Sequence, residues 1–299
     1  MKISVVMATY NGAKYLEQQI QSILNQTLKP EEFIVCDDGS TDETVIILEK
    51  YAQQGKLSYV INNRQLGLIA NFKKAVALAS NNHYTALSDQ DDVWLPEKLE
   101  KSAQLLRQID NPAIPCMVYS DLILVDQNDT ILNASFRNER GQSGYQYNLK
   151  TLLLNNFVNG CTTLFNPELK RRFAEIPDDV LLNHDSWMAL LTFTFGKSAY
   201  IPLSLVRYRK HESNASITGD VKPKSRYHSI MNELMDSMKG QNKFLAAEFA
   251  TAQRFYDCYA DEITGDKKIA LEKFLSFQHK PYIFKKIFYH KTLKQFGIQ

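Results

Sequence analysis

Ser88-Asp89-Gln90-Asp91-Asp92-Val93-Trp94 is the most informative stretch of this chain, because three carboxylates fall within four residues where the apolar run 84–87 ends. Successive side chains of a β-strand point to opposite faces, so Asp89 and Asp91 can converge at the end of a strand. Oxygen ligands of this kind suit Mg²⁺ or Mn²⁺, which usually keep open positions for phosphate oxygens of a substrate. The alternative is a solvated acidic turn that caps a helix opening at Pro96.

Around this stretch, short apolar runs alternate with segments of helical periodicity. We expect strands at residues 2–8, 33–36, 57–61 and 84–87. Helices are expected between them, the second beginning with a capping box of Ser40 and Glu43. The alternation predicts an α/β fold with a mainly parallel sheet and flanking helices. Because ligands bind beyond the carboxyl ends of such strands, residues 9–12, 37–40 and 89–92 should share one cleft.

The second half of the chain is less regular. We expect helices at 96–109, from Pro167 and from His184. We expect strands at 116–120, at 122–125, at 198–201 and in a short segment that ends at Phe165. After Gly219 the pattern predicts helices rich in aromatic residues. Beyond Lys273 the chain has no acidic residue, and its lysines alternate with Phe, Tyr and Ile.

Length and composition narrow the class of protein. The chain has 299 residues, of which 44% are hydrophobic and 23% charged, which is typical of one large or two small soluble domains. A net charge of +2 gives no sign of nucleic-acid binding. No apolar run approaches a membrane span, and the N-terminus does not resemble a signal peptide, so we expect a cytoplasmic protein. Four scattered cysteines without C-x-x-C spacing predict buried thiols rather than zinc or disulfides.

The expected cleft is acidic, with five aspartates at positions 37, 38, 89, 91 and 92. A phosphate-rich ligand normally binds positive groups or helix N-termini, so such a cleft requires a divalent ion as mediator. The ion would act as a Lewis acid that carries the charge of a leaving diphosphate. The chain lacks G-x-G-x-x-G after the first strand and lacks G-x-x-x-x-G-K-[ST], which disfavours a nicotinamide enzyme and a P-loop NTPase.

Several motifs together resemble family 2 inverting glycosyltransferases with the GT-A fold. The matching positions are 5–11, 37–42, the loop residues Asn63, Gly67 and Asn71, the stretch 88–94, and Asn183-His184-Asp185. The resemblance covers roughly residues 1 to 211, and the runs 67–72 and 88–94 are most similar to bacterial rhamnosyltransferase-type members. It implies a GT-A domain at residues 1–215, with a nucleotide-binding half at 1–95, an acceptor-side half at 96–215, and a helical C-terminal extension at 216–299.

The resemblance also implies a nucleotide site. Its residues would be Thr9, Tyr10, Asn11, Asp38, Asn63, Gly67, Asn71, Asp89 and Gln90. Thr9 and Tyr10 would wall the base, Asp38 would accept a hydrogen bond from the imide N–H of uracil or thymine, and Asp89 would approach the ribose. The alternative for residues 37–38 is an Asx turn with a helix cap, and Asn and Gly are ordinary loop residues.

The remaining implied roles concern the reaction. Asp91 and His211 would bind the metal, and Arg207 and Arg209 would pair with the diphosphate. Inversion is a single displacement, so the acceptor hydroxyl must lose its proton to a nearby base, which the resemblance places at Asp185. The alternatives are an N-cap aspartate at position 185 and a surface histidine at position 211.

These observations predict a metal-dependent glycosyltransferase. It would move a sugar, with rhamnose as the favoured guess, from dTDP or UDP to a hydroxyl of a bacterial cell-surface polysaccharide or a lipid-linked precursor. The basic, aromatic C-terminus would contact anionic lipid at the inner face of the membrane, or else form a helical cap with solvated lysines. The competing hypotheses are a nucleotidyltransferase acting on sugar phosphates, and a non-catalytic nucleotide- or glycan-binding module of the same fold.

Overall fold

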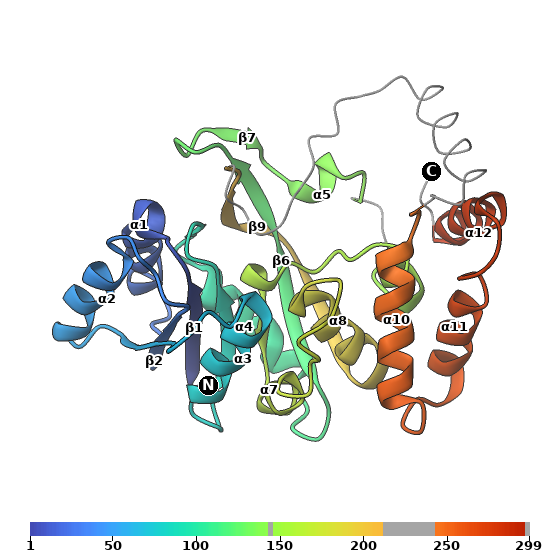
Figure 1. Cartoon of the computed structure of the whole chain (residues 1–299), viewed down its shortest axis with the longest axis horizontal. Coiled ribbons are helices and arrows are strands. Elements are labelled where there is room, and N and C mark those ends of the chain that lie inside the picture. Colours follow the sequence, from blue (N-terminus) through green and yellow to red (C-terminus); the bar gives the residue numbers. More distant parts are fainter. Residues whose placement is uncertain (143–145, 212–242, 297–299) are drawn as a thin grey trace. The chain divides into compact units, whose positions relative to one another are not determined.

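The computed structural model describes residues 1–142, 146–211 and 243–296. The chain divides into two compact units (Figure 1). The first unit comprises Met1–Gly141 and Phe157–Lys210, and the second comprises Gln142–Asn156 and His211–Gln299. The boundary that we expected between residues 215 and 216 lies outside the described residues.

The first half of the sheet is parallel, as the alternation of apolar and helical segments predicted. Its strands are β1 (Ile3–Thr9), β2 (Glu32–Asp37), β3 (Ser58–Ile61) and β4 (Tyr84–Ser88). They lie in the order β3-β2-β1-β4, with Thr9 opposite Asp37 and Met7 opposite Ser88. β1 is buried on both faces, which explains why its sequence is a continuous apolar run rather than an alternating one.

Three helices connect these strands: α1 (Ala13–Leu24), α2 (Thr44–Gln53) and α3 (Leu68–Leu78). The spacing of Leu16, Ile20 and Ile23 places all three on the buried face of α1. The expected capping box of Ser40 and Glu43 is wrong, because α2 begins only at Thr44 and has no side-chain cap. Ser40 instead donates its hydroxyl to the carboxylate of Asp37 (2.5 Å).

The second half of the sheet is mixed. Its strands are β5 (Val93–Trp94), β6 (Cys116–Val125), β7 (Ile131–Asn133), β8 (Leu164–Phe165) and β9 (Lys197–Arg209). β6 pairs with β9 in parallel and with β8 and β7 antiparallel, while β5 pairs antiparallel with β9. β6 is one strand instead of the two expected, because its register shift beside Asp121 is an irregularity within continuous pairing. Figure 1 shows the hairpin of β6 and β7.

The other helices of the first unit are α4 (Lys98–Ile109), α5 (Phe136–Glu139), the 3₁₀ helix η1 (Gly160–Thr162), α7 (Pro167–Phe173) and α8 (His184–Phe195). α8 ends at Gly196, where an added Cβ would lie 1.7 Å from the carbonyl oxygen of Pro115. Lys197 N–H donates to that same oxygen (2.9 Å). Only glycine therefore fits between α8 and β9.

The described helices of the second unit are α6 (Leu149–Leu152), α10 (Ala246–Tyr259), α11 (Gly265–Leu275) and α12 (Tyr282–Gln295). Stacked rings join them, with Phe249 4.4 Å from Phe274 and Phe277 4.1 Å from Phe288 between centroids. Among the described residues, no helix combines the length and apolar character needed to cross a bilayer. Three of the cysteines are buried as expected, but Cys258 on α10 is exposed.

Candidate active site

The turns after β1, β2 and β4 lie at one edge of the sheet, because these three strands are parallel neighbours. Hydrogen bonds join them directly. Asn11 N–H donates to Ser40 Oγ (2.8 Å). Gln90 bridges the main chain of Tyr10, accepting from its N–H (2.9 Å) and donating to its carbonyl oxygen (3.0 Å). The expected common edge is therefore present, and Tyr10 is 43% exposed there.

The turn after β2 is held together by its own carboxylates. Asp37 is fully buried and accepts from Thr9 Oγ1 (2.8 Å), from the N–H groups of Gly39 and Ser40, and from Ser40 Oγ. Asp38 accepts from Leu66 N–H (2.7 Å), which fixes the following loop to this turn. Every oxygen of these two carboxylates thus has a donor within the protein.

The loop after β3 contains three of the residues expected to bind nucleotide. Gly67 adopts φ +85° and donates its N–H to Asp38 Oδ2 (2.8 Å). Asn71 is buried, and its amide donates to Cys36 O (2.9 Å) and accepts from Asn62 (2.9 Å). Asn63 is exposed. The structure thus places Asn71 inside the protein as a support of the loop, with Asn63 at the surface.

The turn after β4 has a different character. Burial raises the pKa of Asp89 to about 7, and the charges of Asp91 and Asp185 act in the same direction. Burial and the charges of Asp91 and Asp89 also raise the pKa of Asp92 well above its ordinary value. Asp92 Oδ2 is buried without a hydrogen-bond partner. These carboxylates are crowded together with few donors to stabilise their charge.

Asp185 lies at the start of α8, as expected, and close to this second turn. Burial raises its pKa to about 6, although hydrogen bonds from the N–H groups of Ser186 and Gly160 oppose the shift. A Cβ added at Gly160 would lie 3.7 Å from both Asp185 Cβ and Leu87 Cδ1, which places the start of α8 beside the end of β4. The influence of Asp185 on the pKa of Asp89 agrees with this proximity.

The neighbour of Asp185 in sequence, His184, faces the interior. Its ring lies 4.4 Å from that of Phe72 between centroids, and burial lowers its pKa to about 4. Its Nε2 would lie 3.0 Å from a Cβ at Gly160. His184 is therefore uncharged at neutral pH and packs in the interior. Gly160 leaves room for its ring, because a larger residue there would meet Nε2.

Sequence reasoning missed Lys98, which is completely buried at the start of α4. Its Nζ lies 3.5 Å from the centroid of the Trp94 ring and has no hydrogen-bond partner. Burial lowers its pKa to about 7, while the neighbouring Cys161 and Asp92 act in the opposite direction. Lysines are almost never fully buried, so no sequence signal distinguishes it from the solvated lysines of the chain.

A divalent cation fits the turn after β4. Ligand atoms of Asp89, Asp92 and Cys161 lie within 4.8 Å of one another. Burial raises the pKa of the Cys161 thiol well above its ordinary value, and a protonated thiol is a poor ligand for a hard cation, so the carboxylates are the suitable donors. Asp91 adds its charge to this group. β9 ends at Arg209, two residues before His211, and His211 belongs to the second unit. The crowded carboxylates would be stabilised by a positive ion.

The two arginines expected at the diphosphate have protein partners. Arg207 donates to Asp129 (2.6 Å) and is partly exposed. Arg209 is 2% exposed and donates its Nε–H to the carbonyl oxygen of Asp91 (3.0 Å) and an Nη2–H to Gln18 (2.8 Å). The structure therefore turns Arg209 away from solvent and towards the main chain of the acidic turn.

The parallel sheet with a mixed extension and an acidic turn after its fourth strand defines the GT-A class of glycosyltransferases. Residues 4–166, more than half of the chain, match the model of glycosyl transferase family 2. The chain therefore belongs to glycosyl transferase family 2, whose members are nucleotide-sugar glycosyltransferases.

Individual relatives agree with this family. An uncharacterized glycosyltransferase of Methanocaldococcus jannaschii is 39% identical over 136 residues, which is 44% of this chain and 44% of that protein. The dTDP-rhamnosyl transferase RfbG of Shigella flexneri is 28% identical over 75% of this chain and 78% of its own length.

Solved structures show the same fold. The S. aureus TarS fragment 1–349 in complex with UDP-GlcNAc has a TM-score of 0.58 at 17% identity, covering 100% of this chain and 82% of that one. The mannosyltransferase PcManGT from Pyrobaculum calidifontis, in complex with GDP-Man and Mn²⁺, has a TM-score of 0.57 at 18% identity, covering 99% and 75%. Both comparisons confirm the predicted GT-A architecture.

Proposed function

We propose that this chain is a metal-dependent inverting glycosyltransferase that moves a sugar from a dTDP or UDP donor to a hydroxyl of a bacterial cell-surface polysaccharide or lipid-linked precursor. Rhamnose is the favoured sugar, supported by the similarity to a dTDP-rhamnosyl transferase. Family membership supports a nucleotide-sugar donor. In this proposal residues 1–95 bind the donor and residues 96–215 complete the acceptor side.

One observation carries the proposal: the crowding of Asp89, Asp91 and Asp185. Burial raises the pKa of Asp89 to about 7, and the charges of Asp91 and Asp185 act in the same direction. A cluster of carboxylates is stabilised by a divalent cation, which when bound would take up the negative charge of the departing diphosphate. Asp89 and Asp91 of the first unit would hold this ion.

The general base in this proposal is Asp185. Its pKa of about 6 leaves it ionised at neutral pH, while the raised value makes it a stronger base than an ordinary aspartate. The N–H groups of Ser186 and Gly160 hold the carboxylate in a fixed orientation at the start of α8. Asp185 would accept the proton of the acceptor hydroxyl as that oxygen attacks the anomeric carbon.

The nucleotide would lie against the turns after β1 and β2. Exposed Tyr10 offers a ring face to the base, with Thr9 and Asn11 on either side of it in the chain. Asp38 already accepts hydrogen bonds from Asn62, Leu66 and Gly67. A carboxylate has about four lone-pair sites, so it can accept one further bond from the imide N–H of uracil or thymine.

Calorimetric titration of UDP, dTDP, GDP and CDP, each with and without Mn²⁺, tests the proposal. We expect Mn²⁺-dependent binding of dTDP or UDP in preference to GDP and CDP, and loss of the Mn²⁺ effect in Asp91→Asn. Glu168→Gln, which changes a carboxylate paired with Arg171 on α7, is the matched control and should bind like the wild type. Binding that is indifferent to Mn²⁺, or a preference for GDP, would contradict the proposal.

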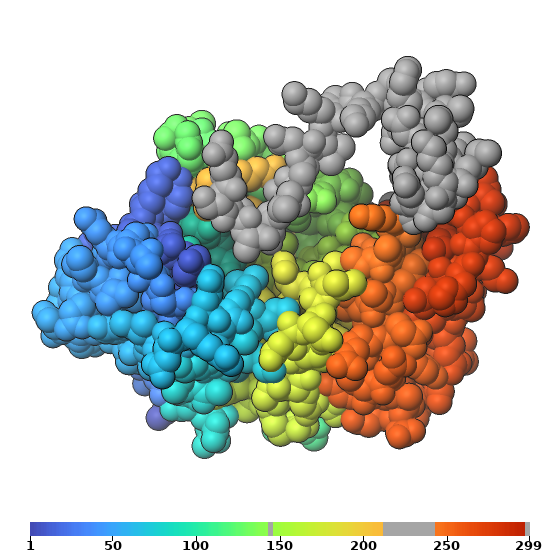
Figure 2. All heavy atoms as spheres, viewed as in Figure 1, coloured from blue at the N-terminus to red at the C-terminus, as the bar shows by residue number. Residues whose placement is uncertain are grey.

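We also propose that the second unit contacts anionic lipid at the inner face of the cell membrane. Its helix α12 exposes Ile283, Phe284 and Ile287 to more than half of their full extent. Figure 2 shows α10 to α12 as the orange-to-red surface. From Lys273 to the end of the sequence there is no carboxylate side chain, so this segment attracts anionic headgroups.

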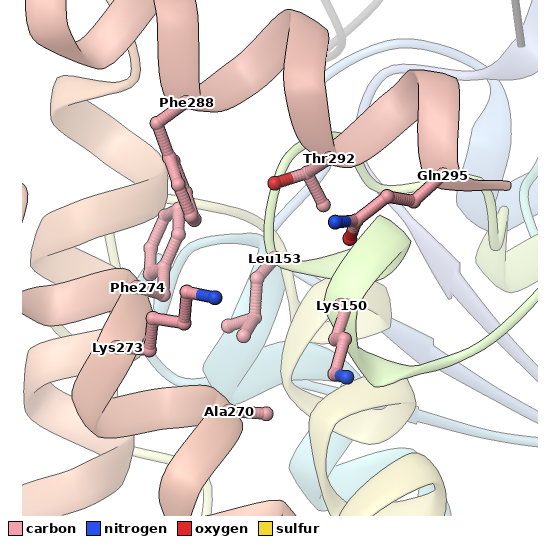
Figure 3. Close-up of a pocket in the computed structure, with 8 residues that line it drawn as sticks. All are labelled: Lys150, Leu153, Ala270, Lys273, Phe274, Phe288, Thr292 and Gln295. Atoms are coloured by element: carbon pink, nitrogen blue, oxygen red, sulfur yellow. The ribbon is translucent and has the colours of Figure 1, made fainter.

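A pocket on the second unit combines apolar side chains with basic and polar ones. Figure 3 shows its lining residues, which are Lys150, Leu153, Ala270, Lys273, Phe274, Phe288, Thr292 and Gln295.

Co-sedimentation with phosphatidylglycerol vesicles tests the membrane proposal. We expect Ile283→Asp with Ile287→Asp to reduce binding, whereas Ile131→Asp on β7, equally exposed in the first unit, should not. Equal binding by both variants would contradict it.

A further inference from the structure

The carboxyl end of β9 holds an arginine that contacts two consecutive residues of the acidic turn. Arg209 Nε–H donates to the carbonyl oxygen of Asp91 (3.0 Å). Its own backbone N–H donates to Asp92 Oδ1 (3.3 Å). Both contacts are buried or partly buried, and the side chain is only 2% exposed. A single residue of β9 therefore fixes the main chain at Asp91 and the side chain at Asp92.

The other side of the guanidinium is anchored on different elements. Nη2 donates to Gln18 Oε1 on α1 (2.8 Å), and the group lies 4.6 Å from the centroid of the Tyr15 ring. Nη1 reaches the carbonyl oxygens of Asp126 and Gln127, each at 3.4 Å, at the turn between β6 and β7. The planar fork of an arginine makes these contacts in several directions at once, which a lysine cannot do.

The turn needs such an external anchor. Ligand atoms of Asp89 and Asp92 lie within 4.8 Å of one another, and the strand that follows, β5, is only two residues long. β5 pairs with β9 through Val93 and Arg207, so the same strand that carries Arg209 also holds the exit from the turn. Without Arg209, the main chain before β5 would lose the donor that faces the Asp91 carbonyl.

We propose that Arg209 is a positioning residue for the acidic turn: it holds the main chain of Asp91 so that the carboxylates of residues 89 and 91 are preoriented for a divalent cation. The role of the turn rests on the function proposed above, whereas the contacts of Arg209 do not. The sequence suggested that Arg209 contacts the diphosphate. In this proposal it acts instead by holding the acidic turn, because its guanidinium makes hydrogen bonds inside the protein.

Hydrogen exchange of the peptide spanning residues 88–94, measured by mass spectrometry, tests the positioning directly. Arg209→Lys keeps the charge but loses the fork, so we expect about tenfold faster exchange in this peptide. We also expect the Mn²⁺-dependent part of dTDP or UDP affinity to fall about 10–100-fold, with metal-free nucleotide binding unchanged.

Arg137→Lys is the matched control, because Arg137 is also buried, lies 4.1 Å from the centroid of the Tyr200 ring and donates to the carbonyl oxygen of Phe157. It should lose comparable thermal stability without faster exchange at residues 88–94. Equal exchange of that peptide in both variants would show that Arg209 acts only through overall stability, and would overturn the inference. If the wild type shows no Mn²⁺-dependent binding, the proposed function fails, while the exchange result still decides the role of Arg209.

A second variant covers the case in which Arg209→Lys does not fold. Gln18 is exposed on α1 and accepts from Nη2, so Gln18→Ala removes one anchor of the guanidinium and leaves the core unchanged. We expect a smaller increase in exchange at residues 88–94 than in Arg209→Lys. Wild-type exchange there in Gln18→Ala would contradict the anchoring role.

Discussion

Two acidic turns flank the first strand of this protein, and they use their carboxylates in opposite ways. After β2, Asp37 and Asp38 accept hydrogen bonds from neighbouring hydroxyl, amide and backbone N–H groups. After β4, Asp89 and Asp92 have raised pKa values, and Asp92 keeps a buried oxygen without a partner. The carboxylates after β2 therefore stabilise the loop by accepting hydrogen bonds, whereas those after β4 are left with negative charge that a bound cation could stabilise.

The largest effect should come from the base that belongs to the second group of carboxylates. Asp185→Asn keeps an oxygen that can accept from Ser186 and Gly160 but cannot take a proton at neutral pH. We expect transfer to fall about 10²–10⁴-fold, as for the loss of a general base. Steady-state kinetics with saturating donor measures this, and donor binding together with the melting temperature checks that the variant is folded. Near-normal transfer would remove Asp185 from the mechanism.

A large effect of a different kind is expected in the first turn. Asp37→Ala removes the acceptor of bonds from Thr9, Gly39 and Ser40, so we expect the free energy of unfolding to fall by about 3 kcal/mol. Urea denaturation measures it. Asp126→Ala, which removes two backbone hydrogen bonds in the exposed turn before β7, is the control and should cost less. If both changes have the same small effect, the structural role of Asp37 is wrong.

The pH dependence should follow the base. Because Asp185 must be unprotonated to accept a proton and its pKa is about 6, transfer at saturating donor and Mn²⁺, where the proposed metal ligand Asp89 is ionised, should be constant above that value. Below pH 6 the rate should fall about tenfold for each pH unit, since the ionised fraction falls in proportion. Rates with saturating donor between pH 5 and 8 measure the profile. A flat profile across pH 6 would show that another group, or a different pKa, controls the reaction.

The smallest expected effect is a change in stability at Asp91, and its sign should be opposite to that at Asp37 in the other turn. Asp91→Asn removes a charge that raises the pKa values of Asp89 and Asp92, so in the absence of metal we expect stability to rise by about 0.5–2 kcal/mol. Thermal unfolding with EDTA present measures it against the wild type. A fall in stability of the size expected for Asp37→Ala would mean that the two turns have the same structural role.

The parallel half of the sheet was predictable because its information is local. The apolar runs before residues 9, 37 and 89 end where β1, β2 and β4 end, and the chemistry of the site follows from that edge. The mixed half depends on long-range pairing. No local pattern distinguishes two strands around Asp121 from the single irregular β6. Likewise, no local pattern shows that residues 142–156 join the second unit.

The site shows the same limit. Motif spacing identified the acidic turn, and the family resemblance identified Asp185, whose charge influences Asp89 in the structure. It did not reveal that Lys98 is buried under Trp94, or that Arg209 contacts the turn instead of solvent. Both side chains have charges that a sequence pattern assigns to the surface or to a ligand. Arg209 depends on Asp91, which lies far away in the chain, and the surroundings of Lys98 include the equally distant Cys161 as well as Trp94.

The junction at Gly196 has a consequence for how this chain can vary in length. α8 passes into β9 with no spare residue, and the carbonyl of Pro115 fills the space beside the glycine. A residue inserted within α8 would turn Asp185 by about 100° relative to the fixed end. Changes in length are therefore better accommodated before His184, in residues 177–183, which follow the buried Ile176 and are exposed or half-buried.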